Sequence, residues 1–364
     1  MSIRSASIRS TSIRSDVRSV LGLAAIFVLA MPLTTRAAEP AAGFYKDKTI
    51  NFIIGYPPGS GYDVHARALA HYIGRHIPGA PTIVPQNMPG AGSLKATNYI
   101  YNVAPKDGTV LGAINRSLAM APLLETDAEM KKQLRFDPLK FNWIGSMDNV
   151  TSIGICRVDS GLTSFDQFRK RQVILTASSP TSDSVVFPTV FNNMLGTKFK
   201  IVAGHQGTGG NFLALERKEA ECYFGTTYSS VKTLKPQWLK PDNGEMRVVV
   251  QIASEKNENL RNVPSIMDYA NKDEKQALEL LLAPQSMGRP YMTTPGVPSE
   301  RVETLRRAFD ATMKDPAFLA EAKKTGIEVE PVSGEAVEKL LKHIYKADPQ
   351  TVTLLRSAMP KKDG

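Results

Sequence analysis

Apolar runs that alternate with helical segments and short glycine-rich turns constrain the fold of this chain more than any other feature. Residues 49–55 form an apolar run, residues 62–77 place apolar side chains at helical spacing, and the order repeats through residues 82–90, 91–104 and 109–114. Strand, helix, strand, helix and strand with short connections predict a parallel, doubly wound sheet. The expected fold class is therefore α/β, and such sheets bind ligands at the carboxyl ends of their strands.

The same pattern restarts around residues 141–152 and predicts a second αβ unit of similar size. Its expected strands are residues 152–158, 172–178, 199–205, 221–228 and 246–253. Its expected helices are residues 164–171, 185–195 and 209–220. Three further helices, which we expect to cover the first unit, are residues 299–315, 316–326 and 333–347. Ser299, with Glu303 following, is predicted to cap the first of them.

The first 37 residues have the composition of a secretory signal peptide. Ser-Ile-Arg-Ser occurs three times before Asp16, the apolar run 20–33 follows, and small residues around Ala37 offer a cleavage site. The apolar run is short for a membrane span. We expect residues 1–37 to be removed on secretion; an uncleaved N-terminal anchor is the alternative.

The charge of the chain argues against nucleic-acid binding. The sequence has 45 basic and 35 acidic residues, and since residues 1–37 hold five Arg and one Asp, the rest carries 40 and 34, a net charge of +6. The basic clusters at 131–135, 169–172 and 359–364 are separate and lack interleaved aromatic residues. This favours a solvated surface with a mild attraction for anions.

Metal-ligating patterns are absent from the sequence. There is no Cys-x-x-Cys motif, and His65, His71 and His76 lie six and five residues apart, so they do not share one helix face. We therefore interpret them as surface or groove histidines and expect neither a metal nor a cofactor.

The turn at residues 55–61 follows an expected strand and opens an expected helix. No lysine follows Gly61 as a phosphate-binding P-loop requires, and Val64 stands where the dinucleotide motif needs its third glycine. Ser60 is flanked directly by glycines, which is the wrong spacing for a nucleophile elbow. What remains is a helix start whose free N–H groups and positive dipole end bind a carboxylate.

A second turn of the same kind spans residues 87–93, again between a strand and a helix. Since both turns stand at the carboxyl ends of strands in one sheet, we expect them to converge on one point. Two converging helix starts strengthen the prediction of an anion site.

These two turns resemble motifs of the periplasmic solute-binding receptors of tripartite tricarboxylate transporters, the Bordetella-uptake-gene type. The family pattern P-x-G-G-G-x-D-x-x-A-R is met by Pro57, Gly59, Gly61, Asp63, Ala66 and Arg67, and N-x-P-G-A-G-G by Asn87, Pro89, Gly90, Ala91 and Gly92. Residues 104–111 resemble its A-P-D-G-Y-T-L turn with one residue of difference, and 136–147, 262–270 and 295–329 resemble further segments. The resemblance runs from about Tyr45 to Tyr345.

The resemblance implies a two-lobed type II periplasmic binding protein fold with two crossing strands as a hinge. Residues 44–146 plus 285–358 would form lobe 1, and residues 147–284 lobe 2. Family ligands are mostly small carboxylates held by main-chain amides and water. The receptor, expected to be a periplasmic monomer, would then present its closed form to integral-membrane transporter subunits.

The expected ligand-binding residues come from the cleft-facing turns of both lobes. They are Tyr56, Pro57, Gly59, Ser60, Gly61, Tyr62, Asn87, Gly90, Ala91, Gly92, Ser93, Arg116, Ser117, Ser178, Ser179, Thr181, Ser182, Gln206, Gly207 and Thr226. Arg116, which follows a strand, is either a carboxylate anchor or a surface residue. Asp63 is expected to be structural, because it lies near a helix start and four residues before Arg67. Met88 and Met120 are expected to pack.

Several positions depart from the family pattern. Ser60 replaces the middle glycine, and residues 205–210 replace a Tyr-Lys/Arg-Gly turn. Tyr62 stands where a small residue is usual, so its ring could stack on an aromatic acid, shorten the pocket or lie on the helix surface.

Three functions use such a fold. The first is the capture of a small organic acid for transport, without catalysis. A hydrolase would need a nucleophile with a base in reach, and among the five histidines only His205 falls on an expected cleft turn. A sensor that reports to a signalling receptor needs the same closing cleft as a transport receptor.

Cys156 and Cys222 are the only cysteines. In the fold that the resemblance implies, the strand that enters a lobe from the hinge pairs antiparallel with that lobe's third strand, which would make the two cysteines cross-strand neighbours. Either they form a disulfide or they are two buried free thiols.

Overall fold

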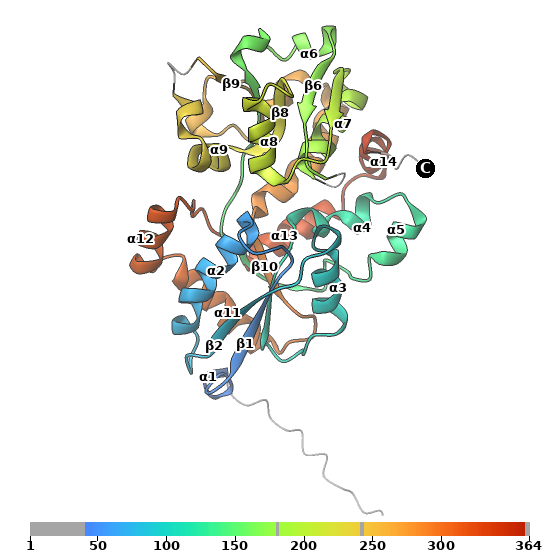
Figure 1. Cartoon of the computed structure of the whole chain (residues 1–364). Helices are drawn as coiled ribbons and strands as arrows, with labels where there is room; N and C mark the ends of the chain where they lie inside the picture. The colour runs from blue at the N-terminus through green and yellow to red at the C-terminus, as the bar shows by residue number, and fades with distance from the viewer. Residues whose placement is uncertain (1–40, 180–181, 241–243, 361–364) are drawn as a thin grey trace, which may run out of the picture. The chain divides into compact units, whose positions relative to one another are not determined.

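The computed structural model describes residues 41–179, 182–240 and 244–360 (Figure 1). Residues 39–364 belong to one compact unit. The expected signal peptide, residues 1–37, lies outside the described residues. Among those that are described, no helix combines the length and apolarity needed to cross a membrane.

The first sheet has six strands in the order β11-β4-β10-β3-β1-β2. Its parallel part consists of β1 (Thr49–Ile54), β2 (Thr82–Asn87) and β3 (Val110–Ala113). The antiparallel part consists of β4 (Asn142–Ser146), β10 (Pro290–Thr293) and β11 (Val332–Ser333). The sequence did not predict these last three strands, because each is short and lies outside the alternating pattern.

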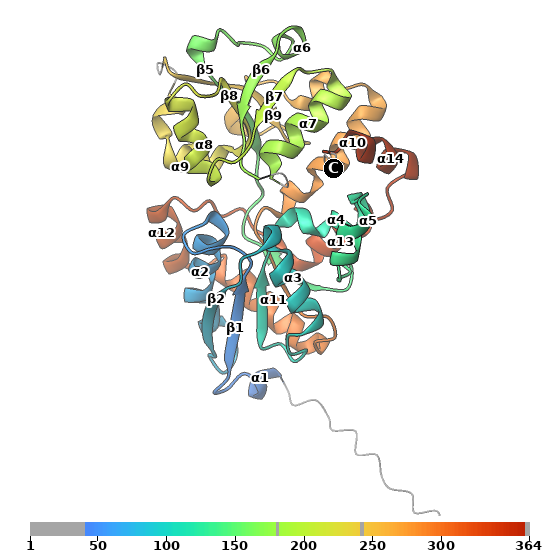
Figure 2. The same cartoon turned by 45° about the vertical axis from the view of Figure 1, so that its right-hand side comes forward.

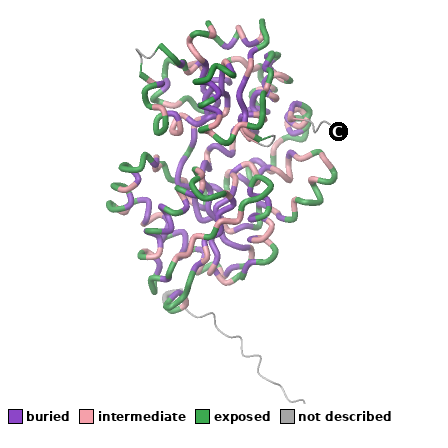
Figure 3. The backbone as a smooth tube through the Cα atoms, viewed as in Figure 1, coloured by how far each residue is buried: buried purple, intermediate pink, exposed green. Residues whose placement is uncertain are grey.

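Helices cover both faces of the first sheet because strand β1 is apolar on both sides. Ile50, Phe52 and Ile54 pack in one cluster with α2 (Gly61–Ile73) and α11 (Ser299–Thr312), whereas Ile53 packs in another with α3 and α13. Figures 2 and 3 show these helices around buried strands. The other helices of this half are α1 (Ala41–Phe44), α3 (Leu94–Asn102), α4 (Ala121–Leu124), α5 (Ala128–Gln133), α12 (Pro316–Thr325) and α13 (Gly334–Ile344).

The second sheet has five strands in the order β7-β6-β8-β5-β9. They are β5 (Ser152–Arg157), β6 (Val173–Thr176), β7 (Phe199–Val202), β8 (Cys222–Thr227) and β9 (Met246–Ile252). β6 runs parallel to β7 and β8, whereas β5 runs antiparallel to β8 and β9. The helices are α6 (Gln167–Lys170), α7 (Asp183–Leu195), α8 (Gly207–Glu216), α9 (Tyr228–Leu234) and α10 (Lys272–Leu282).

The α/β class with two sheets is thus confirmed, and both sheets are mixed. Two chain segments connect them, one from β4 to β5 and one leading into β10, and they are bonded to each other. The Met147 N–H donates to the Arg289 carbonyl at 3.3 Å, and the Gly288 N–H donates to the Asp148 carbonyl at 2.9 Å. A Cβ at Gly288 would lie 2.6 Å from an Asp148 carboxylate oxygen, so this close approach requires glycine.

The predicted cap at Ser299 is wrong. Helix α11 begins at Ser299 itself, Pro298 is the residue before it, and no side chain caps the end. The Pro298 carbonyl already accepts from the Arg301 N–H at 2.9 Å, so the chain enters the helix one residue earlier than predicted. Ser299 then has the position of a first helical residue, where its hydroxyl does not serve as a cap.

The last helix, α14 (Pro349–Ala358), was not predicted as an element. It packs against α10 and α7 of the second sheet, and the Asn193 side-chain amide donates to the Ala358 carbonyl at 2.9 Å. Arg356 Nε donates to the carbonyl of Leu123 in α4 at 2.9 Å. The chain end therefore bonds to segments far away in the sequence.

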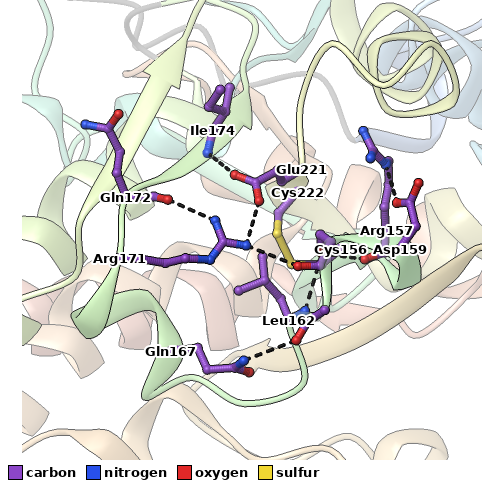
Figure 4. A network of polar contacts seen from close by, with 12 residues as sticks. Cys156, Arg157, Asp159, Leu162, Gln167, Arg171, Gln172, Ile174, Glu221 and Cys222 are labelled. Atoms are coloured by element: carbon purple, nitrogen blue, oxygen red, sulfur yellow. Dashed lines mark hydrogen bonds and ion pairs between the residues drawn. A yellow bond between two sulfur atoms is a disulfide. The ribbon is translucent and has the colours of Figure 1, made fainter.

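The two cysteines form a disulfide. Cys156 on β5 lies directly opposite Cys222 on β8, with Cα atoms 4.0 Å apart, and both side chains are buried. Polar contacts among neighbouring residues surround the bridge (Figure 4), among them a 2.7 Å ion pair between Arg171 and Glu221. The disulfide alternative is therefore confirmed over two free thiols.

Removal of this bridge tests its contribution to stability. We expect Cys156→Ser with Cys222→Ser to lower the free energy of unfolding by about 4 kcal/mol, because a bridge across 66 residues of chain restricts the unfolded state. Urea unfolding of both proteins measures the difference. Thiol titration of the denatured, unreduced wild type should find no free thiol; two reactive thiols per chain would contradict the bridge.

Candidate functional site

The first glycine loop, residues 55–61, connects β1 to α2 at the carboxyl end of the sheet. Gly59 has φ +78°, a left-handed conformation that favours glycine. Ser60 caps α2, and its hydroxyl accepts from the Asp63 N–H at 3.3 Å. The N–H groups of Gly61 and Tyr62 lie in the first turn, where a helix provides no acceptor, so they are free to bind an anion.

Asp63 fixes the shape of this loop. Its carboxylate accepts from the Gly59 N–H at 2.8 Å, from Arg67 Nε at 2.9 Å and from the Asn87 side-chain amide at 2.7 Å. The expected structural role of Asp63 and its pair with Arg67 are confirmed. The carboxylate also joins α2 to the end of β2, which the sequence did not indicate.

Asn87, expected to bind ligand, uses its side chain within the protein. Its amide nitrogen donates to the Tyr56 carbonyl at 2.8 Å and to Asp63, and its amide oxygen accepts from Arg67 at 2.6 Å. Asn87 therefore positions the first glycine loop.

These bonds shift the acidity of Asp63. Burial of the carboxyl favours its neutral form, but the hydrogen bonds from Asn87, the Gly59 N–H and Arg67 outweigh burial and hold the pKa of Asp63 below its ordinary value. The carboxylate is therefore ionised at neutral pH and keeps its bonds.

The second glycine loop, residues 88–93, has a run of positive φ angles. They are 144° at Gly90, 46° at Ala91, 60° at Gly92 and 81° at Ser93. Ser93 is buried, and a Cβ on Gly55 would lie 1.8 Å from its hydroxyl oxygen. The two glycine loops are thus in contact at Gly55 and Ser93, as their convergence predicted.

Arg116 stands in the loop after β3. It is 7% exposed, so it is not a surface residue, and its guanidinium forms an ion pair with Asp183, the first residue of α7. Burial opposes the charge of Arg116, but Asp183 together with Tyr62, Asp148 and Tyr56 outweighs burial and raises the pKa of Arg116. The neighbouring Ser117 N–H donates to the Asn115 side chain at 2.9 Å.

Tyr62 lies between two arginines. Its ring stacks on that of Tyr56 with centroids 4.4 Å apart and planes within 1°, and the Arg289 guanidinium carbon lies 5.2 Å from the Tyr62 ring centroid. Its hydroxyl accepts from the Arg116 backbone N–H at 3.2 Å. Of the three expectations for this ring, none included stacking on Tyr56.

His65 lies one helical turn after Gly61 and bonds to its carbonyl at 2.6 Å through Nδ1. Burial and the charge of Arg289 lower the pKa of His65 to about 4. The ring is therefore neutral at physiological pH and adds no charge to the site.

The expected residues of the second sheet form a hydroxyl-rich turn before α7. Ser178 Oγ accepts from the Asn211 side-chain amide at 2.7 Å, and the Ser182 hydroxyl donates to the Ser179 carbonyl at 2.6 Å. Thr226 is buried on β8, and its hydroxyl has no hydrogen-bond partner. Thr181 lies outside the described residues.

Three further residues of the expected site are exposed. Pro57 belongs to the first glycine loop and faces solvent. Gln206 precedes α8 without a side-chain cap bond, and Gly207, with φ +59°, begins that helix.

Met88 is half-buried against the apolar core, as expected of a packing residue, and Met120 is fully buried.

An apolar cavity of about 240 Å³ adjoins Arg116 and Asp183. Its walls include the second glycine loop at Ala91 and Gly92, and most of its lining is hydrophobic. No residue of the first glycine loop lines it. Within residues 41–179, 182–240 and 244–360, no group of His, Cys, Asp or Glu is arranged to hold a metal ion.

Sequence reasoning missed Arg289, Asp148 and Asp183. Asp183 and Arg116 are 67 residues apart in sequence, and Asp148 and Arg289 lie on the two connections between the sheets. No local pattern joins such residues. Asp183 directly follows Ser182, the last expected ligand residue of its turn, and this position was the one sequence signal that it belongs to the site.

Comparison with family models and with curated protein sequences found no match. Solved structures of similar fold exist. A TctC solute-binding protein from Polaromonas shares 16% identity at a TM-score of 0.63, over 86% of this chain and 99% of that one. The periplasmic binding protein BugD shares 20% at 0.62, over 86% and 98%. MatC from Rhodopseudomonas palustris, solved with bound malate, shares 16% at 0.60, over 85% and 99%.

These likenesses confirm, at the level of fold, the resemblance that the two loop motifs carry. The fold of this chain is the two-lobed fold of TctC and BugD, which are solute-binding proteins. At such low identity the fold alone is shared, so the binding properties of this chain follow from its own residues.

The Asp63 network gives a prediction for stability against pH. A carboxyl whose folded-state pKa is lowered contributes stability above its unfolded pKa, and this contribution is lost as the pH falls through the folded-state pKa. We expect Asp63→Asn to cost about 1.5–3 kcal/mol in the free energy of unfolding at pH 7. The cost should shrink at an acid pH below the folded-state pKa of Asp63, where the wild-type carboxyl is protonated as well.

Urea unfolding at both pH values measures this difference. Glu258→Gln is the control, because the Glu258 side chain is 89% exposed. A loss for Asp63→Asn that is equal at both pH values would show that the carboxylate charge does not stabilise the loop.

Proposed function

We propose that this chain is a periplasmic solute-binding receptor that captures a small organic acid and delivers it to a tripartite tricarboxylate-type membrane transporter. The observation that carries the proposal is the contact between two glycine loops at the carboxyl ends of β1 and β2, beside the buried cation Arg116. The free N–H groups of Gly61 and Tyr62 supply hydrogen-bond donors without a mobile side chain.

A carboxylate suits this arrangement better than a phosphate does. Helix-start amides bind either anion, but the first glycine loop lacks the lysine of a phosphate loop. Arginine forms two parallel hydrogen bonds with a carboxylate, and Arg116 is positioned by its backbone bond to Tyr62. In the proposed complex a ligand carboxylate competes with Asp183 for Arg116.

The family assignment rests on two independent supports. The loop motifs at residues 57–67 and 87–92 resemble those of the Bordetella-uptake-gene receptors. The fold is that of TctC and BugD, and MatC of the same fold holds malate. We therefore propose the expected lobe boundaries, residues 44–146 plus 285–358 and residues 147–284, with one change: α14 (Pro349–Ala358) packs on α10 and α7, so we count it with the second lobe. We also propose a monomeric receptor that docks on membrane subunits.

We also assign the ligand contacts to the turns named from the sequence. Backbone N–H groups of Gly61, Tyr62, Gly90, Ala91 and Gly92 would provide most donors, because those of Gly59, Ser60 and Ser93 already donate to Asp63, Pro57 and Gly90. The residues around them would be Gly59, Ser60, Ser93, Arg116, Ser117, Ser178, Ser179, Ser182, Gln206, Gly207 and Thr226. Tyr56, Pro57 and Asn87 would shape the loop.

The hydrolase alternative has little support in the described residues. His205, the histidine expected on a cleft turn, bonds through Nδ1 to Thr176 at 3.0 Å, and its Nε2 lies 3.8 Å from Glu219. Neither contact is with a serine of the glycine loops. A nucleophile needs a base in hydrogen-bond reach.

Calorimetry tests the proposed function. We expect the mature protein to bind one molecule of at least one acid per chain in a panel of malate, succinate, adipate, citrate and benzoate. A saturating acid at a hundred times its Kd should raise stability by about 3 kcal/mol, which thermal unfolding detects. The absence of binding to every acid, together with hydrolysis of an ester or amide, would contradict the proposal.

The second glycine loop gives a further prediction. Gly90 has φ +144°, and a Cβ there would meet only the flexible Lys95 side chain at 3.4 Å. Gly90→Val is therefore expected to distort the loop rather than the core, and to abolish acid binding in a folded protein. The first-loop variant Gly61→Val should also abolish binding, by a different route: Gly61 is not strained, and the valine would cover the amides.

Gly196→Val is the matched control. Gly196 ends α7 with φ +71° and has no atom within 4 Å of an added Cβ, so a valine there also strains the backbone without a steric clash. Calorimetry with the best acid of the panel compares the three variants. Wild-type affinity in folded Gly90→Val would show that this loop is only a turn.

A further inference from the structure

Arg289 is a buried cation that the glycine-loop motifs do not include. It is 8% exposed and stands just before β10, on the connection between the two sheets. Its guanidinium lies over the Tyr62 ring at 5.2 Å from the centroid, in the first turn of α2. An arginine at this depth calls for partners for each of its N–H groups.

Only some of the side-chain N–H groups of Arg289 have a hydrogen-bond partner in the protein. Nη1 donates to the neighbouring Gly288 carbonyl at 3.3 Å and lies 3.4 Å from an Asp148 carboxylate oxygen. Nε is buried and has no hydrogen-bond partner, and neither has the other Asp148 oxygen, Oδ1. Because an unpartnered buried donor is costly, this guanidinium has capacity for another acceptor.

The unsatisfied guanidinium faces the start of α2. Its Nη2 atom lies 3.7 Å from the point where a Cβ on Gly61 would stand. The Gly61 and Tyr62 N–H groups, which lack intrahelical acceptors, belong to the same turn. The buried Arg289 and the start of the thirteen-residue helix α2 thus offer donors on the same side of the first glycine loop.

We propose that Arg289 and the Gly61 and Tyr62 amides form a binding site for one carboxylate group of the captured acid. The inference rests on the proposed function and names the cation that anchors the acid at the first glycine loop. One carboxylate oxygen would accept from the guanidinium and the other from the helix-start amides. A glycine at position 61 leaves room for that oxygen beside Nη2.

Arg289 also has a purely structural position. Its backbone carbonyl accepts from the Met147 N–H, and its backbone N–H donates to the Ser146 hydroxyl at 3.0 Å, across the connection between the sheets. A side-chain substitution keeps these backbone bonds. A structural role would weaken the binding of charged and uncharged ligands alike, whereas an anchor discriminates between them.

The test is a cycle that combines a protein variant with a ligand variant. The probes are the five acids of the panel, malate, succinate, adipate, citrate and benzoate, each compared with the analogue in which one carboxylate is replaced by an amide. We expect the wild type to prefer at least one acid over its amide by about 10- to 100-fold. In Arg289→Met this preference should fall below about threefold, and Arg289→Lys should keep part of it because it retains the charge without the planar fork.

Arg301→Met is the matched control. Arg301 likewise has an unpartnered buried Nε and lies over an aromatic ring, Phe44, at 3.5 Å, but it contacts the turn before β3 at Asp107, away from the carboxyl ends of the strands. It should keep the wild-type preference.

The outcomes separate this site from the proposed function. If the wild type binds none of the five acids, the proposed function fails and the Arg289 site fails with it. If the wild type prefers the acid and Arg289→Met keeps that preference, only the Arg289 site is overturned. If Arg289→Met does not fold, an unchanged preference in Arg289→Lys overturns the site and a reduced one supports it.

Discussion

The carboxylate of Asp63 is the interaction on which the candidate site depends. It binds the Gly59 N–H, Arg67 and Asn87, and Asn87 in turn holds the Tyr56 carbonyl. These bonds tie the loop after β1 to the end of β2 and orient the first turn of α2. Because the ionised form makes them, the lowered pKa of Asp63 and the shape of the loop have one cause. The N–H groups of Gly61 and Tyr62 are thereby oriented before an anion binds.

The two buried arginines near Tyr62 are each paired with an acidic residue. Arg116 reaches its hydroxyl through the backbone and pairs with Asp183, while Arg289 lies over its ring near Asp148. Each buried arginine thus has an acidic neighbour, which offsets the cost of burying the cation. The Arg289 pair is the less complete of the two, because its closest contact with Asp148 is 3.4 Å and Nε is unpartnered.

The sequence predicted those features that depend on neighbouring residues. The strand and helix pattern placed β1, α2 and β2, and the motif around Gly59 and Gly61 placed the loop between them, because turn chemistry and helical spacing are local. The partners of Arg116 and Arg289 could not be predicted, since each is fixed by how distant segments pack. The role of Asn87 shows the same limit: its motif indicated a ligand contact, but its amide is used by Asp63, Tyr56 and Arg67.

The pairing of these arginines limits how an acid gains affinity in the proposed site. A ligand carboxylate at Arg116 replaces the Asp183 carboxylate, so one ion pair is exchanged for another and the net gain is small. The Gly61 and Tyr62 N–H groups have no intrahelical acceptor to give up, and Arg289 has only a partial one. Affinity and selection for a carboxylate therefore arise chiefly at the first glycine loop, and the exchange at Arg116 frees Asp183 on α7. Binding at one sheet is in this way coupled to the start of a helix that packs on the other.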